Sequence, residues 1–225
     1  WGAVFLGIFL CFFLIVKQPD LGTALLVSIA GFFPVFLSGF PLSFIFLSTI
    51  VLISLYPLYW AGLKEYQQER IFTLFNPDSD PLGAGWNIAQ SKMAIGSGGY
   101  LGKGYLEGTQ SQLDFIPESH SDFIFAVIAE ELGLLGIAFL LLLYLFILYR
   151  IFYISFNAET EFNRLMSASI GFIFLTYIIV NISMVVGIFP VVGVPLPLVS
   201  QGGTSLVVHL IAFGFVLSMK RRQTW

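Results

Sequence analysis

The chain has 225 residues, of which 57% are hydrophobic and 10% are charged, and its formal net charge is −3. Soluble globular domains carry about 25% charged residues, so this composition excludes an ordinary soluble domain and predicts a protein built for lipid. The chain has no basic block of the kind that binds nucleic acid, and its single cysteine, Cys11, excludes an internal disulfide.

Six apolar segments approach the length of about 20 residues that a helix needs to cross the hydrocarbon core of a bilayer. We therefore predict an all-α fold, a polytopic membrane helix bundle that forms one domain over residues 1–225. The predicted spans are 2–16, 20–38, 41–60, 122–149, 165–189 and 203–219. The first is short and the chain begins inside it at Trp1, so we expect that further spans precede it in the whole protein.

The charges around these segments predict their orientation. Lys220, Arg221 and Arg222 follow the last segment directly, and such positive flanks remain in the cytoplasm. Counting the spans backwards places loop 61–121 outside, where seven acidic residues outnumber four basic ones. We therefore expect a multi-pass protein with a cytoplasmic C-terminus, and an acidic residue, Asp122, at the outer mouth of its span.

Two regions break the pattern of simple spans. The loop 61–121 is too long and too rich in glycine for a plain connection, and loops of this length are usually functional. Within it Trp86, Ala89, Gln90 and Met93 recur at helical spacing, which predicts a short helix on the membrane surface. The apolar segment 189–205, FPVVGVPLPLVSQGGTS, has three prolines and cannot form one helix. We expect a re-entrant or surface-hugging segment that roofs a cavity.

The stretch PESHSDFIFAVIAEELG, 117–133, crowds ionisable residues at the opening of an apolar run. Asp122 fits two roles: a helix N-cap, which a carboxylate suits, or a general base at the mouth of a cavity. On a continuous helix, four small residues would lie within about 40° of the direction of Asp122: Ala126, Ala129, Gly133 and Gly136. Such a stripe lets another helix approach closely or leaves room for a ligand.

The other ionisable residues also have more than one interpretation. Glu130 would lie about 12 Å deeper than Asp122, and acidic groups inside a membrane are usually functional. His120 fits either an orienting group for a substrate or an exposed loop histidine, and Asp20 fits either an N-cap or a site. We interpret His209, alone in the last span, as a buried packing or hydrogen-bonding group. The two histidines and the carboxylates show no metal-ligand spacing.

The glycine-rich stretch GSGGYLGKG, 96–104, is comparable to a phosphate-binding loop. It has Ser97 and Gly104 where the Walker pattern requires a glycine and a serine or threonine, so it does not match that pattern. Its glycines would still expose backbone N–H groups to a diphosphate, with Lys103 or Lys92 adding positive charge. The alternative is a flexible loop without a ligand.

Three stretches carry a resemblance to a known family: QPDLGTALL at 18–26, the stretch from WNIAQ to ELGLLG at 86–136, and NISMVVGIFPVVGVPLPLVSQGGTS at 181–205. They resemble the C-terminal part of the RodA/FtsW-type proteins of the SEDS family (shape, elongation, division and sporulation), and GTQSQLDFIPE is closer to the RodA branch. Family members have ten membrane helices, so the six expected here would be the fifth to the tenth. The chain departs from the usual pattern at Ser121, where threonine is common, and at Gln201, where the common form carries an aromatic residue.

The resemblance implies a peptidoglycan glycosyltransferase that polymerises lipid II into glycan strands at the bacterial cytoplasmic (inner) membrane, during cell-wall elongation and cell-shape maintenance. The essential acid of the family maps onto Asp122, which we expect to be the catalytic general base of an inverting transfer. The resemblance also implies a divalent cation, Mg²⁺ or Mn²⁺. Its implied partners are lipid II, undecaprenyl-diphosphate-linked glycan, a class B penicillin-binding protein and the membrane. We expect substrate-binding roles for Asp20, Lys103, Gln110, Glu118, His120 and Glu130.

Two other functions remain open at this point. A transporter (flippase) of lipid-linked cell-wall precursor would need paired charges at mid-depth and inverted repeats. Here the ionisable residues gather at the outer surface, apart from Glu130 and Glu131, which favours catalysis. A non-catalytic scaffold for a penicillin-binding protein would leave Asp122 dispensable.

Overall fold

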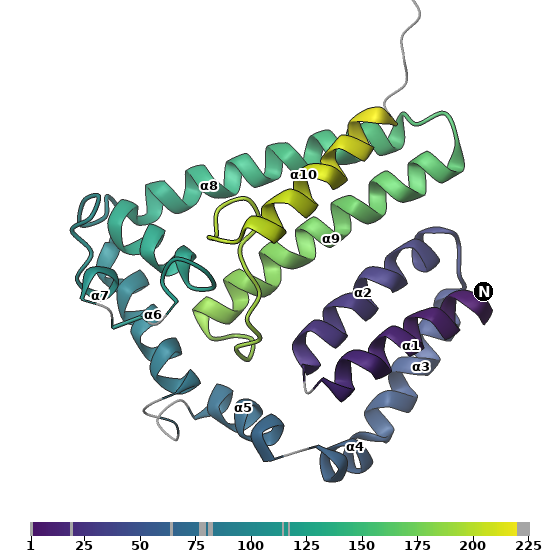
Figure 1. The fold of residues 1–225 in the computed structure, drawn as a ribbon, viewed down its shortest axis with the longest axis horizontal. Coiled ribbons are helices and arrows are strands. Elements are labelled where there is room, and N and C mark those ends of the chain that lie inside the picture. The colour runs from purple at the N-terminus through teal and green to yellow at the C-terminus, as the bar shows by residue number, and fades with distance from the viewer. Residues whose placement is uncertain are drawn as a thin grey trace, which may run out of the picture.

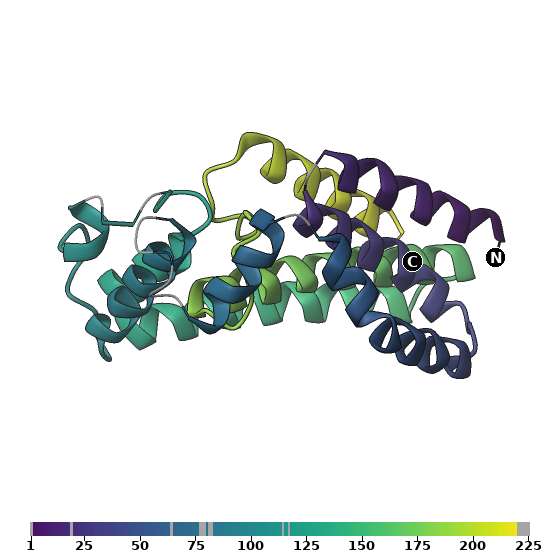
Figure 2. The ribbon, with the colours of Figure 1, turned by 90° about the horizontal axis from the view of Figure 1, so that it is seen from below.

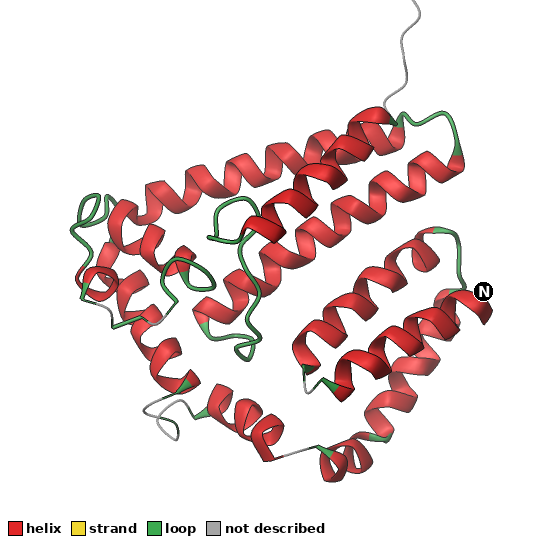
Figure 3. Ribbon diagram, viewed as in Figure 1, coloured by secondary structure: helices red, strands yellow, loops and turns green. Residues whose placement is uncertain are grey.

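A computed structural model gives the fold, and it describes residues 2–18, 20–63, 65–76, 80, 83–113, 115–116 and 118–219. Every regular element in these ranges is an α-helix, as the sequence predicts (Figure 3). In chain order the helices are α1 (Gly2–Lys17), α2 (Leu21–Leu37), α3 (Leu42–Ser54), α4 (Tyr56–Gly62), α5 (Glu65–Phe75), α6 (Ala84–Gly98), α7 (Thr109–Gln112), α8 (Ile124–Phe156), α9 (Glu161–Val186) and α10 (Gly203–Ser218). Four parts of the charge pattern behind the predicted orientation lie outside the described residues: Lys64, Asp78, Asp114 and 220–222.

Helices α8 and α9 run antiparallel, and α10 lies along them (Figure 1). The ring of Phe174 on α9 packs edge-on against Tyr144 of α8 and Phe213 of α10, with centroids 5.8 and 5.2 Å apart, and ties the three helices together. Helix α2 packs on α9 through the stacked rings of Phe33 and Phe172, and α1 packs on α2. The short helices α6 and α7 gather at the end of the bundle where α8 begins (Figure 2).

Large apolar side chains cover the outside of the bundle. On α8, for example, Phe139, Leu142 and Leu145 are 65%, 63% and 62% exposed. An apolar surface this extensive is unfavourable in water and is typical of a face that contacts lipid. Helices α8 and α9, with 33 and 26 residues, are long and apolar enough to cross a bilayer, and α1, α2 and α10 are shorter apolar helices.

The predicted span 41–60 forms two helices, α3 and α4, rather than one. Helix α3 ends at Ser54, and α4 begins at Tyr56. Pro57 explains the interruption, because proline has no N–H to donate to the carbonyl four residues earlier, yet it is well tolerated in the first turn of a new helix.

Helix α8 is interrupted at Gly133, where φ is 65° and ψ is −161°. In a continuous helix the N–H groups of the next two residues would donate to the carbonyls of Glu130 and Glu131. They donate instead to carbonyls of loop 99–104, at 2.9 and 3.2 Å, and those two glutamate carbonyls accept N–H groups of the same loop, both at 3.0 Å. The loop therefore replaces two helical hydrogen bonds with four of its own.

The start of α8 at Ile124 and its break at Gly133 together correct two predictions. Asp122 precedes α8, so the stripe below it does not continue along one helix face, and Gly133 faces the backbone of residues 100–102 rather than a helix or a ligand. The N–H groups of residues 102–104 donate to the carbonyls of Gly98, Glu130 and Glu131, so they are not free to bind a diphosphate. Of the two interpretations of this stretch, diphosphate binding is therefore contradicted for the N–H groups of residues 102–104.

The short helix predicted around Trp86 exists as α6, and one of its faces packs into the protein. Ile88, Ser91 and Ala94 are buried, and α6 packs against α8 and α9. Of the predicted stripe, Trp86 and Met93 are 38% and 49% exposed, whereas Gln90 is buried. The hydroxyl of Ser91 donates to the carbonyl of Val185 at 2.8 Å, a contact that spacing within α6 alone does not reveal.

Replacing Gly133 with alanine should destabilise the protein by about 1–3 kcal/mol. The backbone at Gly133 is in a region that side-chain-bearing residues rarely adopt, and a Cβ there would meet the backbone of loop 99–104. Gly96→Ala in α6 is the matched control, because a Cβ there has nothing within 4 Å. Thermal unfolding of both variants in the same detergent measures the difference, and equal melting temperatures would contradict the proposed strain.

Candidate functional site

The turn 118–123 carries the residues that the sequence analysis favours. Glu118 adopts φ of 57°, and its carbonyl accepts the N–H groups of Ser121 and Phe123 at 3.0 and 3.4 Å. The hydroxyl of Ser121 donates to the Glu118 carboxylate at 3.0 Å. Helix α8 begins at Ile124 with Phe123 as its N-cap and no side-chain capping bond, so the N-cap role considered for Asp122 is wrong.

Asn181 of α9 holds the backbone of this turn. Its side-chain amide donates to the carbonyls of Asp122 at 2.8 Å and Val194 at 2.6 Å, and Asn181 is fully buried. One amide group therefore joins α9, the turn and the Pro/Gly-rich segment 187–202. The sequence analysis did not select Asn181, although an amide in an apolar run was a usable signal, since polar groups at membrane depth need partners.

The Pro/Gly-rich segment 187–202 overlaps the irregular segment predicted at 189–205, and it forms a wall beside the turn. Ser200 donates to the Ser121 carbonyl at 2.6 Å, and the Gln201 N–H donates to the His120 carbonyl at 2.9 Å. From the other side, the buried hydroxyl of Tyr144 on α8 donates to the Pro197 carbonyl at 2.7 Å. The segment contains no regular helix, and these bonds fix its position.

The carboxylate of Asp122 is half-buried, and no side chain or N–H of the described residues donates a hydrogen bond to it. Its Oδ2 lies 3.5 Å from the position that a Cβ on Gly193 would occupy. Burial raises the pKa of Asp122 above its usual value, and the negative charge of Glu118 raises this pKa further. The arrangement keeps a relatively basic carboxylate available to a ligand while its backbone is fixed.

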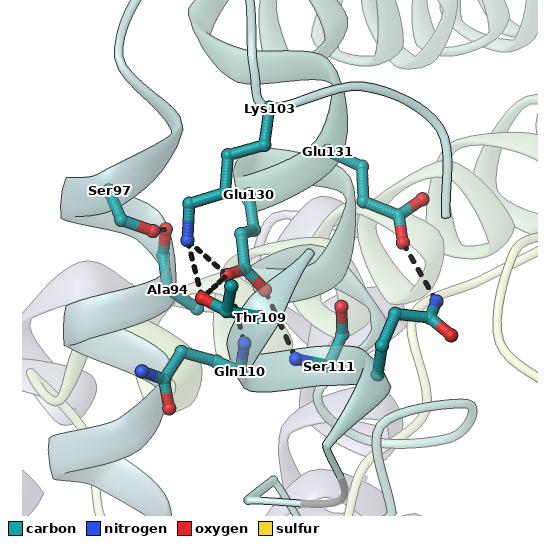
Figure 4. Close-up of polar contacts among 9 residues, drawn as sticks. Ala94, Ser97, Lys103, Thr109, Gln110, Ser111, Glu130 and Glu131 are labelled. Atoms are coloured by element: carbon teal, nitrogen blue, oxygen red, sulfur yellow. Dashed lines mark hydrogen bonds and ion pairs between the residues drawn. The ribbon is translucent and has the colours of Figure 1, made fainter. Parts of the chain in front are cut away.

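Glu130 forms the centre of a second cluster (Figure 4). Its fully buried carboxylate pairs with Lys103 at 2.6 Å and accepts the N–H groups of Gln110 and Ser111 at 3.0 and 3.1 Å. Because those two N–H groups belong to the first turn of α7 and have no partner within that helix, the carboxylate of α8 caps α7. Thr109 adds a hydroxyl at 3.2 Å.

The residues predicted to bind substrate thus fall into three places. Glu118 and His120 share the turn with Asp122, and both side chains are exposed. Lys103, Gln110 and Glu130 meet in the second cluster, where the side-chain oxygen of Gln110 is buried without a partner among the described residues.

Asp20 lies apart from both clusters and caps α2, accepting bonds from the N–H and hydroxyl of Thr23 at 3.0 and 2.6 Å. The adjacent Gly22 abuts Val192 of the Pro/Gly-rich segment, because a Cβ on Gly22 would lie 2.6 Å from the Cβ of Val192. The N-terminus of α2 therefore approaches the wall beside the turn. His209 is buried in α10, as predicted.

A divalent cation would need a set of oxygen ligands. Within the described residues, no three His, Cys, Asp or Glu side chains converge closely enough to hold a metal ion. Asp122 and Glu118 are an acidic pair on one turn, which falls short of such a set. The described residues therefore do not fit a cage made by protein side chains alone.

Replacing Glu130 with glutamine should lower the free energy of unfolding by about 1–3 kcal/mol, because it removes a charged acceptor from buried hydrogen bonds. Amide hydrogen exchange at Gln110 and Ser111 should accelerate, since their N–H groups lose that acceptor. Glu161→Gln is the control, because its ion pair with Arg164 is exposed and should contribute nothing measurable. Unchanged exchange at both amides would show that Glu130 does not hold α7.

Comparison with known proteins gives consistent matches. A family model described as cell cycle proteins of the FtsW, RodA and SpoVE type matches residues 1–224. The peptidoglycan glycosyltransferase MrdB of Escherichia coli K12 is 51% identical over 219 residues, which are 97% of this chain and 59% of that protein. The peptidoglycan glycosyltransferase RodA of Treponema pallidum is 42% identical over 161 residues, 72% of this chain and 37% of that protein.

Solved structures agree with these relatives. A chain from a study of polymerization and crosslinking by a peptidoglycan synthase complex matches with a TM-score of 0.76 and 35% identity, over 91% of this chain and 56% of that one. The rod shape determining protein RodA of Thermus thermophilus matches with a TM-score of 0.61 and 28% identity, over 96% of this chain and 55% of that one. The present chain spans less than two thirds of each relative. It belongs to the FtsW/RodA/SpoVE family, and its helices form a membrane bundle of that family.

Proposed function

We propose that this chain carries the catalytic site of a peptidoglycan glycosyltransferase, which polymerises lipid II during cell-wall elongation and cell-shape maintenance. The observation that carries the proposal is the Asp122 carboxylate, which is fixed by its backbone and accepts no hydrogen bond from the described residues. Relatives with up to 51% identity that are named peptidoglycan glycosyltransferases support this assignment.

In the proposed reaction, the 4-hydroxyl of an acceptor N-acetylglucosamine attacks the anomeric carbon of a donor sugar. The new C–O bond forms as the bond to the diphosphate oxygen breaks, undecaprenyl diphosphate leaves with the electron pair, and the hydroxyl proton moves to Asp122. An α-linked donor becomes a β-1,4 bond, so the configuration inverts, and one base suffices without a covalent enzyme intermediate. The raised pKa of Asp122 makes it a stronger base than an ordinary aspartate.

The leaving diphosphate also needs positive charge. Lys103 is paired with Glu130. Lys92 makes no ion pair with the described residues, and its Nζ lies 2.8 Å from the position of a Cβ on Gly187, at the end of α9. Asn181 of the same helix donates to the carbonyl of Asp122. Gly187 is six residues beyond Asn181, which corresponds to about 9 Å along a helix. We therefore assign the counter-charge to Lys92.

The contacts of the deeper acids weigh against a transporter. A flippase would need intramembrane charges that can change partners during transport. Glu130 is fully buried and fixed by Lys103 and α7, and Glu131 is buried and accepts a bond from Gln112 at 3.1 Å. Glu130 thus joins α8 to Lys103 and α7, and Glu131 joins α8 to Gln112 of α7. The carboxylate that has no such partner among the described residues is that of Asp122, in the turn before α8.

We further propose that the turn faces the outside of a bacterial inner membrane, that the C-terminus is cytoplasmic, and that a class B penicillin-binding protein is the partner. The match to a chain of a peptidoglycan synthase complex supports the partnership. The basic residues 220–222, which directly follow the last apolar segment, support the orientation.

Asp122→Asn should reduce lipid II polymerisation by the intact protein by about 10²–10⁴-fold, the usual contribution of a general base. Glu107→Gln, an exposed carboxylate in the same loop, is the control and should retain full activity. Gel analysis of glycan strands measures the product, and a liposome assay measures flipping of lipid II. Normal strands from Asp122→Asn would remove Asp122 as the base, and flipping without polymerisation would favour the transporter.

The acidic limb of the pH profile of kcat/KM should move to lower pH in Glu118→Gln. Asp122 is active when ionised, so the rate rises as pH increases through its raised pKa, and loss of the Glu118 charge lowers that pKa. Burial disfavours the ionised carboxylate, so the folded state loses stability as pH rises through this pKa. Asp122→Asn should therefore melt no lower than the wild type at neutral pH. An unchanged acidic limb in the pH profile of Glu118→Gln would exclude coupling between the carboxyl groups of Glu118 and Asp122.

A cysteine at Tyr105, which is 76% exposed, should react with a membrane-impermeant maleimide on intact spheroplasts of a cysteine-free variant. A cysteine at the exposed Asn157, between α8 and α9, is the matched control and should react after permeabilisation. The reverse labelling pattern would overturn the orientation, and with it an outward-facing site.

A further inference from the structure

A small pocket lies between α2, α9, α10 and the Pro/Gly-rich segment, and we name it the α2–α10 pocket. Its volume is about 280 Å³. This is near the lower end of the roughly 300–1,000 Å³ that is typical of ligand sites, so it suits one compact ring better than a long chain. Thr23 of α2, Tyr177 of α9 and His209 of α10 each contribute to its lining.

His209 is 8% exposed, and its Nδ1 lies 2.7 Å from the carbonyl oxygen of Ser205. A carbonyl oxygen can only accept, so Nδ1 carries the hydrogen of this bond. Nε2 then has a free lone pair in the neutral ring, and none of the described residues donates to it. Edge-on contacts with Phe174 and Tyr177, at 5.8 and 5.6 Å between centroids, fix the orientation of the ring.

The lining indicates a neutral ligand with hydroxyl groups. Thr23, Tyr177, Thr204 and Ser205 supply hydroxyls, and no charged side chain is part of the described lining. An anionic phosphate would meet no cation there, and a purely apolar chain would leave Nε2 of His209 without a partner. A sugar satisfies both conditions, because its hydroxyl and acetamido groups bond polar side chains while an aromatic ring packs on its apolar face.

The pocket adjoins the turn. Gly193 lines the pocket, and it is also the residue whose Cβ position lies 3.5 Å from Oδ2 of Asp122. At the opposite wall, Thr23 lines the pocket and donates to Asp20, a residue that the sequence analysis considered for substrate binding. A ligand in the pocket would therefore lie beside Gly193, the residue next to the carboxylate of the proposed base, Asp122.

We propose that the α2–α10 pocket binds the acceptor sugar, the ring whose 4-hydroxyl is deprotonated, and that His209 Nε2 accepts a hydrogen bond from another hydroxyl of that ring. The donor sugar is attached directly to the diphosphate, whereas the attacking hydroxyl belongs to the far end of the acceptor, which is neutral. This inference rests on the proposed glycosyltransferase function and adds to it a subsite and its positioning residue.

Two variants of His209 separate the lone pair from packing. Asparagine can retain the donor that Nδ1 supplies but lacks a group at the Nε2 position, whereas glutamine places an amide near that position. In the intact protein, His209→Asn should raise the apparent KM for lipid II by roughly tenfold, the effect of one lost hydrogen bond, with little change in kcat. His209→Gln should restore the wild-type KM. Equal KM values for the wild type and both variants would overturn the role of His209.

A matched pair of valines tests the pocket itself. Val208 and its neighbour Val207 are both exposed, at 63% and 54%, but only Val208 lines the pocket. Val208→Phe should fill the pocket and raise the KM at least as much as His209→Asn does, while Val207→Phe should leave it unchanged. Melting temperatures of both variants should match the wild type. Identical kinetics for the two variants would exclude a sugar in the pocket.

Binding can be measured without turnover. In the intact protein in nanodiscs with labelled histidines, the ring resonance of His209, assigned by its loss in His209→Gln, should shift on addition of chitobiose, a neutral β-1,4-linked N-acetylglucosamine disaccharide. It should not shift with inorganic pyrophosphate. A shift with pyrophosphate alone, or no shift with chitobiose, would overturn the pocket assignment. If the wild type fails to polymerise lipid II, the proposed function fails, and the resonance still decides whether the pocket binds sugar.

Discussion

The pairing of backbone N–H and carbonyl groups at the end of the long helices is the constraint on which the rest of this structure depends. An unpaired backbone group away from water costs several kcal/mol, so an irregular segment is stable there only if other parts of the protein satisfy it. Loop 99–104 meets this requirement by bonding to both sides of the break at Gly133. The Pro/Gly-rich segment meets it through Asn181, Tyr144 and the turn 118–123.

These bonds fix the backbone of the turn that carries Asp122. The carbonyls of His120, Ser121 and Asp122 are held by three donors from the Pro/Gly-rich segment and α9. The turn is fixed through its backbone, so the carboxylate of Asp122 does not have to serve as a structural group. A preorganised group of this kind loses little freedom when a substrate binds, which is the physical advantage of a site on a braced turn.

Asp20, Asp122, Glu130 and Glu131 are all carboxylates, but their environments differ. Asp20 caps a helix, Glu130 caps α7 and pairs with Lys103, and Glu131 accepts a bond from Gln112. Asp122 has none of these partners among the described residues, and its pKa rises. The same functional group is structural where donors surround it, and its pKa rises where burial is not offset by donors.

The sequence alone determined the α-helical membrane character, the approximate helix positions and the irregular segment at 189–205. These features depend on local composition and on prolines, which act wherever the chain folds. The tertiary structure decided the rest. The stripe drawn below Asp122 assumed one continuous helix, but a positive φ at Gly133 redirects every later side chain. The pairing of Lys103 with Glu130, the buried face of α6 and the bonds of Asn181 join residues distant in sequence, and no local periodicity specifies which distant segments will meet.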